Sequence, residues 1–338
     1  MGPSTAQTSL RALARSIHQV SRARSTWRAG SREAELAAGR SENSRQPLAL
    51  DCRARRQDAR ESRNLAKMKS KALSTLFLAL FGLAAIEARP LEREPLRLTY
   101  LANEGFLAEV GDTTLLFDGF LAKPAFGYPA LPADLLDKLG KAEAPFDAID
   151  LALTSHNHGD HFQGEVARDF LLASGKTPLV TTPQVVEALS KTSDWPDDQT
   201  ARIHGIHPEV GESTKRSFDG IEFEALRIPH GGVPGVQNLG CIVRVGGHSI
   251  LHLGDAETAL ETFAPYEKQL KDVSLVLAPV WFFSTEEGRA VLDRYLPAKA
   301  RVAMHFPMQD AEKVVTSFLA NHKQVLAFSK AMQSTSIE

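Results

Sequence analysis

The feature that most constrains this chain of 338 residues is a nine-residue stretch, Thr154–Phe162, with three histidines and one aspartate within six positions. From His156 to His161 the spacing is His-x-His-x-Asp-His. Imidazole nitrogen and carboxylate oxygen together suit Zn²⁺ and similar borderline cations better than Mg²⁺ or Ca²⁺, which prefer shells of oxygen alone. The alternative is a polar loop with chance histidines, but random placement seldom produces this spacing. We therefore predict a metal site.

The local geometry of this stretch allows one ion or two. Alternate side chains of an extended segment project to the same side, so His156 and His158 can bind one ion together. Gly159 permits a tight turn that a residue with a Cβ would resist. That turn can direct Asp160 and His161 toward a second ion. Taken alone, the stretch leaves the number of ions open.

Further candidates follow predicted strands elsewhere in the chain. From Leu96 onward, short apolar runs with strand-like alternation are separated by turn residues and helical patterns. Folds of the α/β class place their chemistry at the carboxyl ends of strands. Three predicted strands lead to a suitable side chain: Ile221–Ile228 before His230, Ser249–Leu253 before Asp255, and Ala300–Met304 before His305.

Other polar residues were weighed against simpler roles. Asp118 ends a predicted hairpin strand, where it can orient the metal loop or a ligand, or serve as an ordinary turn aspartate. His204 and His207 have no near partner in sequence, which favours core or surface positions. His252 lies an odd number of residues before Asp255, so we predict that it faces away from the ligand side.

Two segments are candidates for a substrate pocket. The loop Phe120–Pro132 contains prolines and aromatic residues, and long loops without periodicity are often functional. Simple loop packing is an equal alternative. A helix predicted over Thr258–Lys271 precedes a strand, Val273–Ala278, which continues into the aromatic run Pro279–Phe283. That run can form an apolar pocket wall or a plug in the core.

With these candidates in this order, the chain resembles the metallo-β-lactamase superfamily from about Leu96 to its C-terminus. The family motif His-x-His-x-Asp-His is complete, and the later His, Asp and His follow in order. Asp118 matches an aspartate that ends an early strand in the family. The resemblance implies an α/β fold, a four-layer αβ/βα sandwich in which two β-sheets pack face to face. Helices would lie outside, and metals would bind in a cleft along one edge.

The resemblance also implies a role for each candidate. Two Zn²⁺ ions, with Mn²⁺ or Fe²⁺ as alternatives, would lower the pKa of a shared water and polarise a carbonyl or phosphoryl oxygen. Asp160, the one catalytic residue predicted, would orient that water or receive its proton. The implied ligands are His156, His158 and His230 for the first ion and Asp160, His161 and His305 for the second, with Asp255 bridging both.

Resemblance to subgroups of the superfamily bears on the substrate. Asp255 stands where the commonest zinc β-lactamases carry cysteine, which disfavours antibiotic hydrolysis, and His158 stands where flavodiiron oxidoreductases carry glutamate. The segment Leu98–Phe106 resembles the subgroup of ascorbate-phosphate lactonases and the phospholipase D that releases N-acylethanolamines. In this chain Ala102-Asn103 replaces the usual Gly-His pair of that subgroup. The predicted substrate is a small lactone, ester or phosphodiester, with a lipid-like molecule among the alternatives.

Three classes of function stay open. The first is this dinuclear zinc hydrolase, the second an iron-dependent redox enzyme on the same scaffold, and the third a non-catalytic metal-binding protein. Residues 68–338 carry 25 Lys and Arg against 35 Asp and Glu, a balance of −10 that disfavours nucleic acid as a partner. The oligomeric state is open.

The first 67 residues differ from the rest in composition. They hold 14 Lys and Arg against 6 Asp and Glu, with few aliphatic side chains and no sustained apolar period. Such a segment cannot bury enough surface to offset its ordering entropy. We therefore predict a disordered basic extension over 1–67, in preference to a nucleic-acid arm or a transit peptide.

The next segment has the pattern of a secretory signal peptide, predicted over 68–88. Met68 begins a basic start that is followed by the apolar run Ala72–Ile86. This run is shorter than the roughly 20 residues of a membrane span. We hypothesise that translation begins at Met68 and that residues 89–338, the hydrolase domain, are exported to the periplasm or secreted. The alternative is an uncleaved internal anchor, and mass spectrometry of the natural N-terminus checks the hypothesis.

Overall fold

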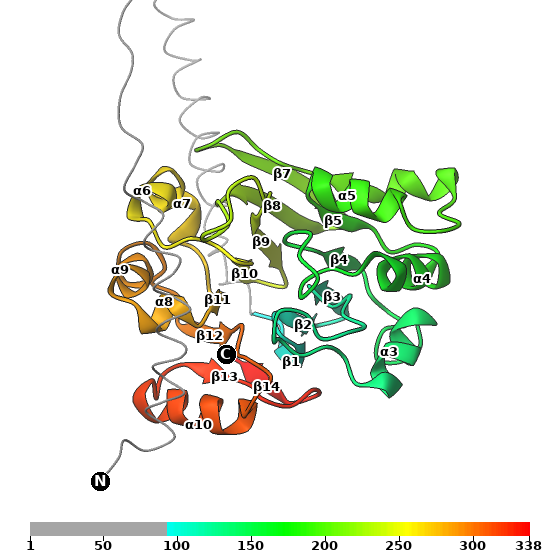
Figure 1. Ribbon diagram of the computed structural model, residues 1–338. Helices are drawn as coiled ribbons and strands as arrows, with labels where there is room; N and C mark the ends of the chain where they lie inside the picture. Colours follow the sequence, from blue (N-terminus) through cyan, green and yellow to red (C-terminus); the bar gives the residue numbers. More distant parts are fainter. Residues whose placement is uncertain (1–92) are drawn as a thin grey trace, which may run out of the picture. The chain divides into compact units, whose positions relative to one another are not determined.

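The computed structural model describes residues 93–338, so the predicted extension over 1–67 and the signal segment over 68–88 lie outside the described residues. In the described part, two seven-stranded sheets form the centre of the fold (Figure 1). The first sheet has the order β14 (Ser334–Ile337), β1 (Leu96–Ala102), β2 (Gly105–Val110), β3 (Thr113–Phe117), β4 (Leu151–Leu153), β5 (Leu179–Thr181) and β6 (Ile203–Gly205). The second has the order β13 (Leu326–Ala327), β12 (Ala300–Met304), β11 (Leu275–Pro279), β10 (His248–His252), β9 (Leu239–Val245), β8 (Ile221–Arg227) and β7 (Ser213–Phe218).

Helices pack on the outer face of each sheet, as the predicted four-layer sandwich requires. None of the described helices is both long and apolar enough to cross a membrane. The helices on the first sheet are α3 (Ala133–Gly140), α4 (Gly164–Ser174) and α5 (Pro183–Ser190). Those on the second sheet are α6 (Leu260–Phe263), α7 (Glu267–Leu270), α8 (Trp281–Ser284), α9 (Glu286–Tyr295) and α10 (Ala311–Asn321). Two 3₁₀ turns, η2 (Asp197–Arg202) and η3 (Ala264–Tyr266), complete the set.

Strand alternation divides the apolar side chains among three layers of core. In β3, Leu115 and Phe117 point into the core between the sheets, whereas Leu116 points into the core beneath α3, α4 and α5. In β11, Leu275 belongs to the core between the sheets and Val276 to the core beneath the second set of helices. Successive side chains of a strand project to opposite faces, so each central strand supplies two cores. Cys241 is buried in this way between the sheets.

The structure corrects three details of the predicted elements. The helix predicted over Thr258–Lys271 is instead three short pieces, because Pro265 lies within η3 and cannot continue a regular helix. Strands β7 and β14 were not predicted from the sequence. Both lie at the edge of a sheet, and β7 has the polar sequence Ser-Thr-Lys-Arg-Ser-Phe with no buried residue. Edge strands of this kind lack the apolar alternation that marks a half-buried strand.

Parallel pairing brings the chain segments that carry the candidate site to the strand ends. In the first sheet β3 and β4 run parallel, and the backbone N–H of Asp118 donates to the carbonyl of Leu153 at 3.0 Å. The motif stretch therefore leaves β4 beside Asp118. In the second sheet β10, β11 and β12 are parallel neighbours, so the segments that contain Asp255 and His305 leave at the same edge.

Candidate metal centre

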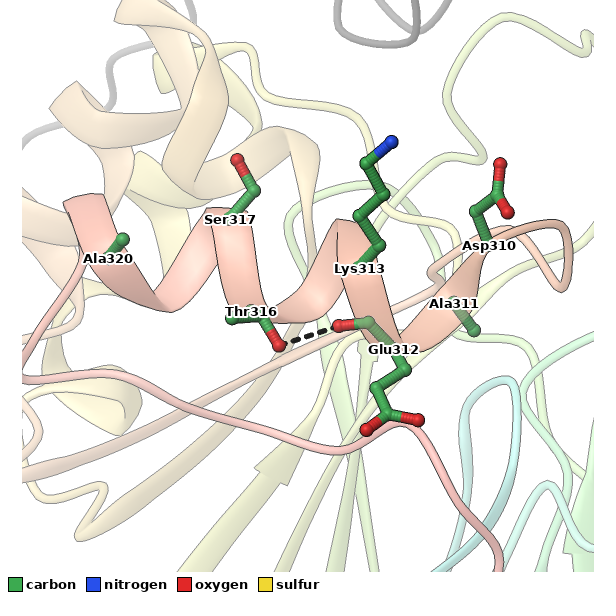
Figure 2. A pocket seen from close by; sticks show the side chains of 7 residues that line it. All are labelled: Asp310, Ala311, Glu312, Lys313, Thr316, Ser317 and Ala320. Atoms are coloured by element: carbon green, nitrogen blue, oxygen red, sulfur yellow. Dashed lines mark hydrogen bonds between the residues drawn. The ribbon is translucent and has the colours of Figure 1, made fainter. Parts of the chain in front are cut away.

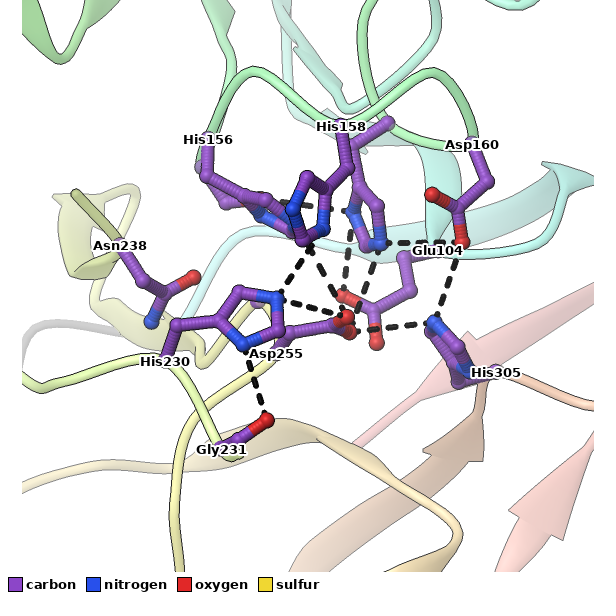
Figure 3. Close-up of polar contacts among 12 residues, drawn as sticks. Glu104, His156, His158, Asp160, His230, Gly231, Asn238, Asp255 and His305 are labelled. Carbon is purple, nitrogen blue, oxygen red and sulfur yellow. Dashed lines mark hydrogen bonds and ion pairs between the residues drawn. The ribbon is translucent and has the colours of Figure 1, made fainter. Parts of the chain in front are cut away.

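The structure gathers all seven predicted ligands in one place (Figure 3). They form two clusters that share Asp255. Asp160 joins the second cluster through its Oδ2, which lies 3.4 Å from His305 Nε2. The first cluster is His156, His158, His230 and Asp255, and the second contains Glu104, His161, Asp255 and His305.

The first cluster has the spacing of ligand atoms around a single cation. His158 Nδ1 lies 3.1 Å from His230 Nε2, which in turn lies 3.2 Å from Oδ2 of Asp255. His156 Nε2 is 3.8 Å from the same oxygen. Ligand atoms about 2.1 Å from a tetrahedral ion are about 3.4 Å from one another. The cluster therefore fits one Zn²⁺-sized ion.

The second cluster is built on the other oxygen of Asp255. Oδ1 lies 3.1 Å from His305 Nε2 and 3.4 Å from His161 Nε2. Asp160 Oδ2 is 3.6 Å from His161 Nε2. These separations again match the edges of a coordination shell. Each oxygen of Asp255 thus faces a different cluster, which is the placement that a bridging carboxylate needs.

Buried atoms without hydrogen-bond partners test whether the clusters suit metal ions. Among the described residues, Nε2 of His156, His161 and His305 and Oδ1 of Asp255 are buried and make no hydrogen bond. A buried polar atom without a partner costs about 1–3 kcal/mol. Four such atoms converge on the two clusters, and a cation in each would supply the partners they lack. The donor set therefore fits two metal ions.

Asp118 orients the motif from beneath. Its Oδ1 accepts the backbone N–H of Ser155 at 2.7 Å, and its Oδ2 accepts from His161 Nδ1 at 2.8 Å. A carboxylate on one ring nitrogen fixes the ring and leaves the other nitrogen for a metal. Of the two roles weighed for Asp118, the structure favours the orienting one. His230 is fixed in the same manner, because its Nδ1 donates to the carbonyl of Gly231 at 3.0 Å.

Three residues in or next to the centre have a strained backbone conformation, and each follows the end of a strand. Asn103, Asp118 and His305 have φ angles of 48°, 37° and 64°, in the left-handed region that favours glycine. Each such residue costs about 1–3 kcal/mol and persists only where its surroundings enforce it. The fold therefore holds the site in an arrangement that the local sequence would not adopt alone.

The two clusters hold their protons differently. Burial lowers the pKa of His156 and His158, and the neighbouring imidazoles lower both further. Burial opposes the charge on His161 and His305 too, but several carboxylates together outweigh it, with Asp255 first among them and Glu104 also contributing. The pKa of His305 rises to about 10, and that of His161 also lies well above its ordinary value. Metal ligation requires neutral imidazoles, so binding at the second cluster must displace protons from His161 and His305, whereas the lowered pKa values of His156 and His158 favour their neutral forms.

Glu104 and Asn103 belong to the site but were not predicted as site residues. Glu104 is fully buried, and burial followed by the charge of Asp255 raises its pKa well above the ordinary value despite nearby His161. Asn103 is also fully buried, and its Nδ2 donates to the backbone carbonyl of Asp160 at 2.8 Å. The only sequence signal was their place at a strand end, in the segment where the chain departs from the Gly-His pair.

His204, His207 and His252 stay outside both clusters, as predicted. His252 is buried, stacks on Phe117 with ring centroids 5.5 Å apart, and donates through Nε2 to the backbone carbonyl of Glu104 at 3.0 Å. It supports the floor of the site. His204 packs against Phe218, with ring centroids 5.0 Å apart. His207 lies 3.2 Å from a guanidinium nitrogen of Arg227.

An open hollow of about 690 Å³ lies along helix α10, and none of its lining residues is a candidate ligand (Figure 2). The one hydrogen bond drawn there joins Thr316 Oγ1 to the carbonyl of Glu312 at 2.7 Å, within the helix itself. Polar groups that satisfy one another along a helix do not form a binding constellation. We assign no role to this hollow.

Comparison with known proteins agrees with the geometry of the centre. Residues 117–325 match the sequence model of the beta-lactamase superfamily domain. The chain belongs to the metallo-β-lactamase superfamily. Within this superfamily, a UPF0173 metal-dependent hydrolase from Pelotomaculum thermopropionicum is 28% identical over 222 residues, which cover 62% of this chain and 84% of that protein.

Solved structures show the same metallo-β-lactamase fold. A protein from Veillonella parvula, described as a possible metal-dependent hydrolase, aligns with a TM-score of 0.50 at 16% identity and covers 71% of this chain and 99% of its own. YhfI from Bacillus subtilis, a metallo-β-lactamase fold protein, has a TM-score of 0.48 at 15% identity and covers 72% of this chain and 100% of its own. The likeness to the first structure confirms the predicted sandwich.

Proposed function

We propose that this protein is a metal-dependent hydrolase whose centre holds two cations bridged by Asp255, with Zn²⁺ in the first cluster. The placement of Asp255 carries the proposal. Its Oδ2 lies 3.2 Å from His230 and its Oδ1 lies 3.1 Å from His305. One carboxylate in this position would offset part of the charge of both cations.

The chain's own residues set where the chemistry takes place. When bound, two cations would lower the pKa of a shared water and polarise a carbonyl or phosphoryl oxygen of the substrate. Asn103 holds Asp160 in position, because its amide reaches the Asp160 backbone carbonyl at 2.8 Å and Oδ2 at 3.4 Å. The other oxygen of Asp160, Oδ1, is buried and makes no hydrogen bond to the described residues. We propose that this oxygen orients the attacking water and accepts its proton.

Aromatic side chains beside the centre support a substrate with an apolar part. Phe126 is 75% exposed, yet its ring centroid is 5.9 Å from that of His158. The ring of Tyr128 is 3.9 Å and that of Trp281 5.0 Å from the ring of His305. Both segments proposed for a pocket thus reach the centre, whereas Val280, Phe282 and Phe283 are buried in the core beneath the second set of helices. We infer a small lactone, ester or phosphodiester with an acyl or aryl group, lipid-like where it is a phosphodiester.

Metal content and a substrate panel test this proposal. We expect the purified full-length protein to contain two metal ions per chain, with zinc present, and to hydrolyse at least one lactone, ester or phosphodiester. Within each class, substrates with an acyl or aryl group should be turned over faster than polar analogues of equal size. Iron with little zinc would favour the redox alternative. Two bound zinc ions with no turnover across the panel would favour the non-catalytic alternative.

A further inference from the structure

Glu104 is a buried carboxylate that the predicted ligand set does not use. It lies in the two-residue turn between β1 and β2, is fully buried, and neither of its oxygens makes a hydrogen bond within the described part of the chain. Glutamate in a hairpin turn is ordinarily exposed, because an ionised carboxylate is costly to remove from water without a partner. The Oε2 of Glu104 lies 3.7 Å from His161 Nδ1, but that nitrogen already donates to Asp118. A buried carboxylate with no hydrogen bond to either oxygen therefore requires an explanation.

The backbone around Glu104 fixes its direction. The carbonyl of Glu104 accepts a hydrogen bond from His252 Nε2 at 3.0 Å, which ties the turn of the first sheet to β10 of the second. Asn103 has a φ of 48°, and a Cβ on Gly105 would lie 2.9 Å from the backbone oxygens of Ala102 and Asp118. The hydrogen bond and this close packing hold the turn against its neighbours, with the side chain of Glu104 enclosed.

The carboxylate of Glu104 lies close to the second cluster. Its oxygen and the ligand atoms of His161, Asp255 and His305 all lie within 4.8 Å of one another. Figure 3 shows the Glu104 and Asp255 carboxylates side by side. Two ligands on opposite sides of an ion with bonds of about 2.3 Å are about 4.6 Å apart. The measured limit is therefore consistent with one shared ion.

We propose that Glu104 is a further carboxylate ligand of the second ion, a role that rests on the two-ion centre proposed above. The second ion would then have carboxylates from Glu104, Asp160 and Asp255 beside two imidazoles, whereas the first has three imidazoles and one shared carboxylate. Oxygen-rich shells with more than four ligands suit Mn²⁺ or Fe²⁺ better than the tetrahedral preference of Zn²⁺. The second site consequently selects a harder cation than the first.

Direct metal binding to the variants Glu104→Gln and Glu104→Ala tests the proposal. The glutamine variant keeps the shape of the side chain and removes its charge. Glu109→Gln is the matched control, because Glu109 lies on β2 and its Oε2 is 3.8 Å from Arg97, away from the centre. Metal stoichiometry, Mn²⁺ and Zn²⁺ titrations, and the visible absorption of the Co²⁺-loaded protein are measured on the full-length chain. Thermal unfolding of the metal-free proteins shows whether each variant folds.

We expect both Glu104 variants to bind the first ion as the wild type does and the second at least about tenfold more weakly. The preference of the second site for Mn²⁺ over Zn²⁺ should fall. Visible absorption of Co²⁺ at the second site should become stronger, because Co²⁺ with fewer ligands absorbs more intensely. The Glu109→Gln variant should match the wild type in all three measurements.

Two results would overturn the proposal, and only the second would also overturn the two-ion centre. If the wild type binds two ions and a folded Glu104→Gln or Glu104→Ala variant keeps the affinity and spectrum of the second site, Glu104 is not a ligand and the two-ion centre stands. If the wild type binds a single ion, the two-ion centre fails and the role of Glu104 fails with it. Should the alanine variant not fold, the glutamine variant decides alone.

Discussion

The two halves of the metal centre share Asp255 but differ in chemistry. The first half presents His156, His158 and His230 to an ion, and the pKa of two of these imidazoles is lowered by burial and neighbouring imidazoles. The second half is rich in carboxylates, which raise the pKa of its two imidazoles despite burial. One half is therefore a neutral nitrogen site that binds readily, and the other is an acidic site that exchanges protons for a cation. The predictions below test whether this difference is real.

Removing the shared carboxylate should have the largest effect. In Asp255→Ala, both clusters lose the carboxylate that they share, so we expect loss of both ions. Hydrolysis should fall by more than about 100-fold, beyond the range that loss of an outer partner of a metal ligand produces. Elemental analysis of the purified variant gives the ion count. Two ions per chain in the folded variant would contradict the bridging role.

Removing a ligand from one half should show whether the two halves bind their ions independently. In His305→Ala, we expect one ion per chain, because the first cluster keeps all of its ligands while the second loses an imidazole. The control is His204→Ala, since His204 packs against Phe218 and lies outside both clusters. It should keep two ions. Equal loss of both ions in His305→Ala would show that the halves do not bind independently.

Replacing Asp118, which orients His161 of the second half, should have a smaller effect. In the wild type, one oxygen of Asp118 accepts from Ser155 N–H and the other from His161 Nδ1. In Asp118→Asn, an NH₂ group replaces one of these oxygens, so one of the two hydrogen bonds is lost. We expect the affinity for the second ion to fall by about 10- to 100-fold. The affinity for the first ion should change less. Isothermal titration with Zn²⁺ measures both. The matched control is Asp150→Asn, whose carboxylate accepts the Thr114 N–H at 2.9 Å away from the clusters.

Sequence reasoning picked out residues that the structure brings together, because the signals for these residues are local. The spacing of His156, His158 and His161 reflects alternation along a single extended segment followed by a turn. His230 and His305 were found from apolar runs that end beside them. The helix prediction over Thr258–Lys271 was wrong although Pro265 was visible in the sequence, because the surrounding helical pattern was given more weight than the proline.

Glu104 could not have been found in this way, because its burial is set by distant parts of the chain. In sequence it is a polar residue in a short turn next to glycine, which is typical of an exposed position. Its environment comes from His252 on the opposite sheet and from Asp255 beyond it. Strand β7 escaped prediction for a related reason, since an edge strand has little buried surface to mark it. Local patterns predict ligands at strand ends, but they do not predict which acidic side chain a second sheet encloses.

The pH dependence of metal binding sharpens the comparison without changing any residue. In the metal-free protein the pKa of His305 is about 10, against an ordinary value of 6.5. Its proton must leave before Nε2 can bind a cation, so the affinity of the second site should rise by about tenfold per pH unit for each proton displaced. His156 and His158, whose pKa values lie below 6.5, have no proton to lose at neutral pH. The affinity of the first site should therefore change little above pH 7.

The stability of the metal-free protein should follow the opposite trend. A raised pKa in the folded state means that charged His305 stabilises the fold below pH 6.5, and that this contribution is lost as the pH rises toward 10. The second ion would supply the positive charge that protonated His305 supplies in the metal-free protein. The gain in thermal stability on adding this ion should therefore grow with pH. Titrations with the first site already filled, at pH 6.5, 7.5 and 8.5, measure the affinity, and thermal unfolding measures the gain. Equal slopes for the two ions would show that the acidic half holds no extra protons, and the division of the centre into unlike halves would then fail.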